Sequence, residues 1–272
     1  MRAFRVAYDG QPFHGFQRQP DVPTVEDAIL DAVAALGVTE GTPEGYAAAG
    51  RTDAGVSAVA QTVAFECPDW LMPAALNSEL PASVRAWASA DAPAGFHATH
   101  HAESRAYVYH CYAPEADLSR AEEALSQLRG EHDFHNLTPD DENTVRDLRG
   151  EVRREGDYLI FRLRAGGFVR EMVRRVVSLV RAVATGDAEL AKVERVLGPE
   201  RVEGPEGVPP APAYPLVLVD AVYPTLEFSV DKEAAASARE VFEGLRERRA
   251  TGARVAREVS ERVESSYGVE SS

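Results

Sequence analysis

The feature that most constrains this sequence is a short loop between two glycines, Gly50 and Gly55, which carries one arginine and one aspartate. Glycine tolerates left-handed and tight backbone conformations, so this spacing predicts a sharply bent loop. The segment Ala58 to Glu66 then alternates, with Val59, Val63 and Phe65 on one face and small or polar residues on the other. Such alternation is typical of a β-strand, so the loop is predicted to lead directly into a strand.

The two charged residues of this loop, Arg51 and Asp53, can be interpreted in two ways. They are two residues apart, and in an extended backbone such side chains point to the same side. A neighbouring guanidinium favours the ionised form of a carboxyl group, which is the form that a nucleophile needs. An arginine and an aspartate in a glycine-rich turn also commonly serve only the structure of the turn. The spacing by itself leaves both interpretations open.

Length and composition limit the class of protein. A chain of 272 residues can bury one large or two small hydrophobic cores. It contains no apolar run long enough to cross a bilayer and no charged-then-apolar leader, so we expect a cytoplasmic protein without a membrane contact. The two cysteines, Cys67 and Cys111, have neither CxxC spacing nor a companion histidine cluster, which argues against a zinc knuckle or a disulfide framework.

The net charge of −15 is unfavourable for an RNA-binding protein, because phosphate contacts usually need a basic face. The charge is uneven, however: from Arg146 to Arg181 there are ten arginines and five acids, a local excess of +5. Lys192 and Lys232 are the only lysines, and an acidic chain with so few lysines suggests a salty, halophilic cytoplasm. At 1 M salt the Debye length is ~3 Å, so RNA binding would depend on stacking, shape and short-range arginine contacts.

Two further segments carry candidate site residues. The alternating segment Arg105 to Tyr112 predicts a strand, in which Tyr107 shares a face with Tyr109 and Cys111. An aromatic face stacks on a nucleobase, and a phenol can hydrogen-bond or move a proton. The segment Phe168 to Ala184 predicts an amphipathic helix that begins after a Gly-Gly pair and carries Arg174 among its arginines.

Two other groups of residues have patterns that do not assign them a function. His97, His100 and His101 lie within five residues, but they lack a carboxylate partner at a fixed spacing, so we predict no metal site there. Near the N-terminus, Phe13 and Phe16 are interleaved with glutamine and arginine. Stacking on RNA and filling the core are equally open roles for these two rings.

Taken in order, these segments resemble the motifs of the tRNA pseudouridine synthase A (TruA) family, from about residue 4 to residue 223. Gly50-Arg51-Thr52-Asp53-Ala54-Gly55-Val56 is similar to the motif that contains the catalytic aspartate of that family. Arg105-Ala106-Tyr107-Val108-Tyr109 resembles its second motif, and Phe168 to Arg174 its third. The resemblance implies that Asp53 is the nucleophile, Tyr107 the active-site tyrosine and Arg174 the arginine that pairs with Asp53.

The resemblance also implies an α+β fold, in which two α/β subdomains with ferredoxin-like halves form one extended sheet. This sheet would be mixed and mostly antiparallel, with helices on one side and a central cleft. Residues 1–100 would form the subdomain with the aspartate loop, and residues 101–228 the subdomain with the tyrosine and arginine motifs. Past Ser229 the resemblance ends, and the Ala/Glu/Arg-rich residues 229–272 predict a helical C-terminal extension. The chain has Ala213-Tyr214-Pro215-Leu216 where the family usually has a small residue and Gly-Leu.

As a function, the resemblance implies a homodimeric isomerase that converts uridine to pseudouridine in the anticodon arm of tRNA, around positions 38 to 40. The target base must leave its stack, and Arg51 would fill the gap or hold the phosphate. Covalent catalysis by a carboxylate needs no cofactor and no metal, so we expect neither. One alternative is a non-catalytic RNA-binding protein on the same scaffold. Another is a glycoside hydrolase, which would need a second carboxylate within about 5–9.5 Å of Asp53.

Overall fold

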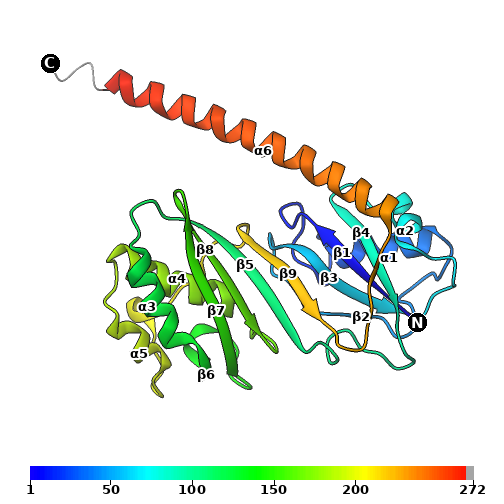
Figure 1. The fold of residues 1–272 in the computed structure, drawn as a ribbon, viewed down its shortest axis with the longest axis horizontal. Helices are drawn as coiled ribbons and strands as arrows, with labels where there is room; N and C mark the ends of the chain where they lie inside the picture. The colour runs from blue at the N-terminus through cyan, green and yellow to red at the C-terminus, as the bar shows by residue number, and fades with distance from the viewer. Residues whose placement is uncertain (268–272) are drawn as a thin grey trace.

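The computed structural model describes residues 1–267, and within them a single ten-stranded sheet runs through the molecule (Figure 1). The strands follow the order β10-β4-β1-β3-β9-β5-β8-β7-β6 across the sheet, with β2 paired to β3. Their bounds are β1 (Arg2–Tyr8), β2 (Ala47–Ala48), β3 (Ser57–Phe65), β4 (Val84–Asp91), β5 (Ser104–Tyr112), β6 (Gly130–Asp133), β7 (Val145–Glu155), β8 (Tyr158–Ala165), β9 (Leu216–Val222) and β10 (Ser229–Val230). The helices are α1 (Val25–Ala35), α2 (Pro73–Glu79), α3 (Leu118–Leu128), α4 (Met172–Thr185), α5 (Ala191–Leu197) and α6 (Lys232–Tyr267), with short 3₁₀ turns η1 (His135–Leu137) and η2 (Gly204–Glu206).

The sheet is mixed and mostly antiparallel, as the sequence predicts. Strands β1, β3 and β4 pair antiparallel in the first half, and β5, β7 and β8 pair antiparallel in the second. The halves meet where β9 lies between β3 and β5, and the β3–β9 pair is parallel, with Ser57 opposite Val217. A strand from late in the chain therefore joins the two halves at the centre of the sheet.

Two hydrophobic clusters lie on the same face of this sheet. One packs β1, β3 and β4 against α1 and α2 and includes Phe4, Ile29 and Leu76. The other packs β5, β7 and β8 against α3, α4 and α5. Tyr107 of β5 contacts both clusters, so it lies at the boundary between the halves. Helices α1 to α5 thus cover one side of the sheet, in agreement with the predicted fold.

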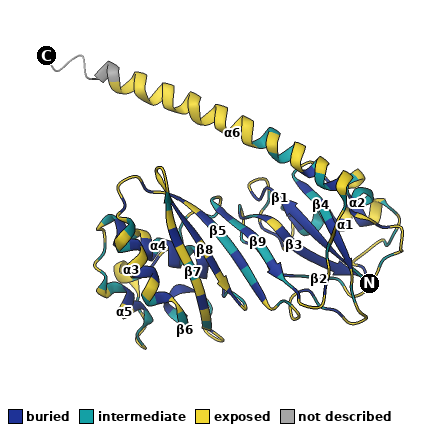
Figure 2. Ribbon diagram, in the orientation of Figure 1, coloured by how far each residue is buried: buried dark blue, intermediate teal, exposed yellow. Residues whose placement is uncertain are grey.

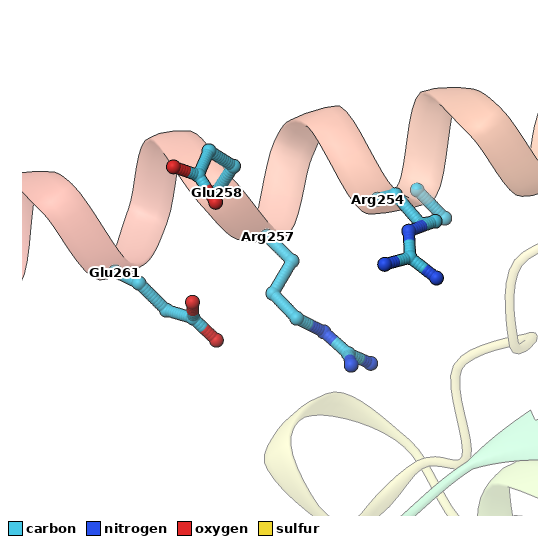
Figure 3. Close-up of a pocket in the computed structure, with 5 residues that line it drawn as sticks. Arg254, Arg257, Glu258 and Glu261 are labelled. Carbon is cyan, nitrogen blue, oxygen red and sulfur yellow. The ribbon is translucent and has the colours of Figure 1, made fainter.

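The last helix, α6, crosses the opposite face of the first half. Its N-terminus is capped by Asp231, whose carboxylate accepts hydrogen bonds from the backbone N–H groups of Glu233 and Ala234. Its first part and the sheet together line an apolar groove of about 780 Å³, with Phe242 on the helix and Val59 on the sheet among the lining residues. Beyond residue 250 the helix continues away from the body as an exposed arm (Figures 1 and 2). Figure 3 shows Arg254, Arg257 and Glu261 extending from one side of this arm.

Two details of the predicted elements are wrong, each for a local reason. Val59 does not share the buried face of Val63 but is 47% exposed, because the pairing of β1 with β3 shifts register between Val6 and Tyr8. Such a bulge moves the following side chains to the other face of the strand. The predicted helix from residue 168 begins only at Met172, because Glu171 adopts a left-handed conformation with φ of 61°.

None of the helices within residues 1–267 combines the length and the apolar composition that crossing a membrane requires.

Gly10, at the end of β1, provides a test of how tightly the first half packs. A Cβ at this position would lie 2.1 Å from the carbonyl oxygen of Val56, a backbone atom that follows the aspartate loop. We expect Gly10→Ala to lower the free energy of unfolding by about 2–3 kcal/mol, because the backbone must move to relieve the clash. Gly41→Ala is the matched control, since a Cβ on Gly41 meets nothing within 4 Å. Denaturant unfolding curves measure both, and equal midpoints would contradict this packing.

Candidate active site

The glycine-bracketed loop, residues 50–55, folds as the sequence predicts and leads into β3. Gly55 has a φ of 83°, a left-handed conformation that favours glycine. The backbone N–H of Val56 donates to the carbonyl of Asp53 at 3.1 Å, which closes a turn. The side chain of Asp53 is 33% exposed, so its carboxylate is accessible while the loop around it is fixed.

The carboxylate of Asp53 forms an ion pair with Arg174 of α4, with 2.9 Å between Nη1 and Oδ2. The partners are 121 residues apart and come from the two halves of the sheet. Arg174 also donates from Nε to the carbonyl oxygen of Ala211 at 2.7 Å, so its guanidinium is held on two sides. A charge-assisted hydrogen bond of this length is among the stronger ones in proteins, and this one aligns the carboxylate.

Tyr107 lies beside this ion pair on β5. Its ring packs edge-on against Phe168, with 5.2 Å between the ring centroids. Burial raises the pKa of Tyr107 to about 12, Arg105 opposes this shift, and the charge of Asp53 adds to it. The Tyr107 hydroxyl is therefore protonated at neutral pH and close enough to Asp53 to sense its charge. The structure thus brings Asp53, Tyr107 and Arg174 together, as the sequence predicts.

Arg51 occupies a different position from the one that its spacing suggests. It is exposed on the loop, and no residue from 1 to 267 accepts a side-chain hydrogen bond from it. The ion pair of Asp53 is formed with Arg174 and not with Arg51. Because the loop is bent, the rule for side chains two residues apart in extended backbone does not hold here.

A buried polar network that no sequence pattern indicated supports the loop. The Tyr8 hydroxyl and Thr52 Oγ1 are 2.8 Å apart, and Gln61 Nε2 donates to the carbonyl of Gly50 at 2.8 Å. Thr52 also accepts from the backbone N–H of Phe16 at 3.0 Å. Phe16 itself is 1% exposed and packs in the core, so of its two open roles the structure assigns the structural one.

Arg105 is a second contributor whose role its sequence pattern did not reveal. Its Nε and Nη2 donate to the carbonyl of Ala49 at 2.9 and 2.6 Å, just before the loop. Nη2 also donates to Thr99 in the crossover between the halves, and Nη1 donates to Gly166 before α4, both at 2.6 Å. One guanidinium therefore ties together the three segments that carry or precede the site residues. Its position two residues before Tyr107, in the same motif, was the sequence feature that could have indicated this role.

No group of three or more histidine, cysteine, aspartate or glutamate side chains within residues 1–267 is arranged to hold a metal ion. The rings of His97 and His100 lie 4.1 Å apart, and Nδ1 of His101 accepts a hydrogen bond from the backbone N–H of His97. The histidines thus contact one another and their own backbone.

Comparison with known proteins adds to this geometry. Residues 124–224 match the sequence profile described as tRNA pseudouridine synthase. A protein named tRNA pseudouridine synthase A from Haloarcula marismortui is 56% identical over 274 residues, covering 96% of this chain and 99% of its own. A protein of the same name from Natronomonas pharaonis is 57% identical over 260 residues, covering 94% of this chain and 97% of its own. Another protein of the same name, from Archaeoglobus fulgidus, is 37% identical over 236 residues, covering 85% of this chain and 87% of its own.

The match to the Haloarcula protein corrects the expected end of the resemblance. Since 96% of the 272 residues are covered, about 11 residues remain unmatched. The sequence similarity to that relative therefore extends beyond Ser229 into the residues of α6.

Arg105 generates a prediction that needs no assumption about function. Replacing it in Arg105→Met removes four hydrogen bonds to three carbonyl groups and should cost about 2 kcal/mol or more. Because these bonds anchor the segment before the loop, we expect the amides of residues 49–56 to exchange hydrogen at least about tenfold faster. Mass-spectrometric hydrogen exchange measures this, with Arg162→Met on β8 as the exposed control. Unchanged protection of the loop would show that Arg105 does not hold it.

Proposed function

Because this chain belongs to the tRNA pseudouridine synthase A family, we propose that it isomerises uridine to pseudouridine in the anticodon stem-loop of tRNA, with Asp53 as the nucleophile. The family makes it an isomerase of the intramolecular transferase type, and tRNA is its substrate. We place the target near positions 38 to 40 of the tRNA and the enzyme in the cytoplasm. Relatives from Haloarcula, Natronomonas and Halobacterium support a halophilic archaeal member.

The observation that carries the proposed mechanism is the ion pair between Asp53 and Arg174. A nucleophilic carboxylate must be ionised, accessible and aligned. The 2.9 Å contact with Arg174 places a guanidinium beside the carboxylate and fixes one carboxylate oxygen, Oδ2, while the side chain stays 33% exposed. The other oxygen, Oδ1, is then free to attack.

In the proposed reaction, the target uridine leaves its stack and enters the space beside Tyr107. The Asp53 carboxylate attacks the nucleoside, at C1′ of the ribose or at C6 of the base. The bond between N1 and C1′ breaks, the uracil rotates, a bond forms between C5 and C1′, and the bond between Asp53 and the nucleoside breaks, which returns the carboxylate. The proton from C5 is lost and N1 gains one, so atoms and electrons balance without an oxidant, a metal or a cofactor.

Two side chains have supporting roles in this proposal. The ring of Tyr107, fixed by Phe168, would stack on the uracil and guide its rotation. Its hydroxyl is protonated at neutral pH, since burial raises its pKa to about 12, and so it can donate a hydrogen bond to the base. Arg51, exposed on the loop, would fill the vacated position in the RNA stack or bind the adjacent phosphate.

The proposal extends to the organisation of the protein. Residues 1–100 and 101–228 would act as two subdomains that form the walls of the cleft, with residues 229–272 as a helical extension. The enzyme would work as a homodimer whose two clefts share the tRNA. The alternative, a non-catalytic RNA-binding protein on this scaffold, has no need for an accessible, paired carboxylate, and the ion pair of Asp53 therefore favours the enzyme.

Replacement of the nucleophile tests the proposal directly. Asp53→Asn should lower pseudouridine formation at least about 1,000-fold while tRNA binding stays near normal, because the amide keeps the shape but cannot attack. Asp31→Asn, at an exposed position on α1, is the matched control and should be fully active. Site mapping by carbodiimide labelling of tRNA from a strain that lacks the enzyme measures the product. Undiminished turnover by Asp53→Asn would remove Asp53 from its role.

Salt dependence provides a second test. With a net charge of −15, the protein repels RNA and itself at low ionic strength. At ~1 M salt the Debye length falls to ~3 Å and this repulsion is screened. We expect turnover to rise severalfold between about 0.2 and 2 M KCl. Single-turnover rates at each concentration measure this, and a maximum at low salt followed by loss in molar KCl would contradict it.

A further inference from the structure

The loop between η2 and β9 carries an exposed aromatic residue beside the candidate active site. Tyr214 is 63% exposed, although a tyrosine gains stability by burying its ring. Its backbone lies against the aspartate loop: a Cβ on Gly55 would be 3.9 Å from the backbone nitrogen of Tyr214 and 3.7 Å from Cβ of Ala213. Gly55 is only two residues after Asp53. The backbone of Tyr214 is thus at the edge of the site.

The loop that carries Tyr214 is held in place by the site itself. Arg174 donates from Nε to the carbonyl of Ala211, and the backbone N–H of Ala211 donates to the carbonyl of Arg174 at 3.2 Å. The Tyr109 hydroxyl donates to Pro212 at 3.0 Å. The N–H of Leu216 donates to Ala213 at 3.0 Å, which closes the turn around Tyr214. These bonds fix the loop backbone on both sides of Tyr214, so the loop loses little conformational entropy when a ligand binds.

The side chain of Tyr214 shares its surroundings with an unused guanidinium. Burial raises the pKa of Tyr109, Cys111 and Tyr214 add to the shift, and Arg174 and Arg181 oppose it. All of these groups therefore lie near the Tyr109 hydroxyl. Arg181 is exposed on α4, seven residues and two helical turns after Arg174, and its side chain bonds to no residue from 1 to 267. Arg181 thus lies about 10.5 Å further along the same face of α4 as Arg174, and Tyr214 lies in the loop that Arg174 binds.

We propose that Tyr214 and Arg181 form a nucleotide subsite next to the catalytic position, in which Tyr214 stacks on an unpaired nucleobase that neighbours the target uridine and Arg181 binds its phosphate. This inference rests on the proposed function, since it requires RNA at Asp53. When the target base leaves its stack, the adjacent base loses a stacking partner, and an exposed aromatic face replaces it. Stacking tolerates any base and survives high salt, whereas long-range charge attraction does not.

Other exposed tyrosines do not have this environment. Tyr112 is 60% exposed, but it pairs with Tyr158 at the far ends of β5 and β8. Tyr112 is five residues along β5 from Tyr107, a distance of about 17 Å in a strand. It is therefore a matched control, a tyrosine of equal exposure away from the site.

The test compares Tyr214→Ala, Tyr214→Phe and Tyr112→Ala with the unchanged enzyme, with tRNA as substrate in molar KCl. Loss of a stacking partner should raise KM for Tyr214→Ala about 5- to 100-fold, with kcat changed less than about threefold. Tyr214→Phe keeps the ring and should restore KM to within about threefold. Tyr112→Ala should leave both constants unchanged. The Kd for tRNA, measured in the Asp53→Asn background where no turnover interferes, should rise with Tyr214→Ala by the same factor as KM.

Three results would overturn the subsite. The first is an unchanged KM and Kd for Tyr214→Ala. The second is a failure of Tyr214→Phe equal to that of Tyr214→Ala, which would indicate a role for the hydroxyl and not for stacking. The third is a change of oligomeric state in Tyr214→Ala by sedimentation, which would make this face a contact between protein copies. The proposed function is tested separately: if Asp53→Asn abolishes turnover while Tyr214→Ala binds normally, the reaction stands and only the subsite fails.

Discussion

The contact on which the site depends is the ion pair between Asp53 and Arg174. It joins a loop of the first half of the sheet to a helix of the second, and its two side chains are only partly exposed, at 33% and 16%. In such an environment the attraction exceeds that of a surface pair, while both ions lose some hydration. The main consequence of the pair is geometric, because it fixes the carboxylate and, through Ala211, the loop that carries Tyr214.

The sheet topology explains how residues so far apart in sequence reach this contact. β9 returns from the end of the second half and inserts between β3 and β5, parallel to β3. Arg105 then ties the segments before Asp53 and before α4 to the crossover through three carbonyl groups. The chain finally crosses back to the first half, where β10 pairs with β4 and Arg249 of α6 forms an ion pair with Asp9 at 2.8 Å. The C-terminal region of the chain therefore packs against the first half of the sheet.

The structure also changes the meaning of the arginine-rich region. The local excess of +5 suggested a basic face for RNA. Several of these arginines are instead paired with acids, namely Arg149, Arg153, Arg170, Arg174 and Arg175. Within residues 1–267, the side chains of Arg51 and Arg181 have no bonded partner, and Arg105 beside the site is bonded only to carbonyl groups. Short-range contacts and stacking, which salt does not screen, therefore have to provide much of the RNA affinity in this acidic protein.

The sequence by itself determined the main local elements and indicated the candidate site residues. Alternation predicted the strands β3 and β5, and the motif order indicated Asp53, Tyr107 and Arg174 together. Spacing alone left Arg51 as the nearer candidate partner of Asp53, whereas the motif resemblance implied Arg174, and the fold brings Arg174 to 2.9 Å. The sequence missed the face change at Val59, because a bulge depends on how two strands pair. It also did not predict the hydrogen bonds of Arg105 to the segment before the loop, or the placement of Tyr214 beside Gly55. Those contacts join segments that are distant in sequence, and no local pattern records which carbonyl or which loop a side chain will meet once the sheet has formed.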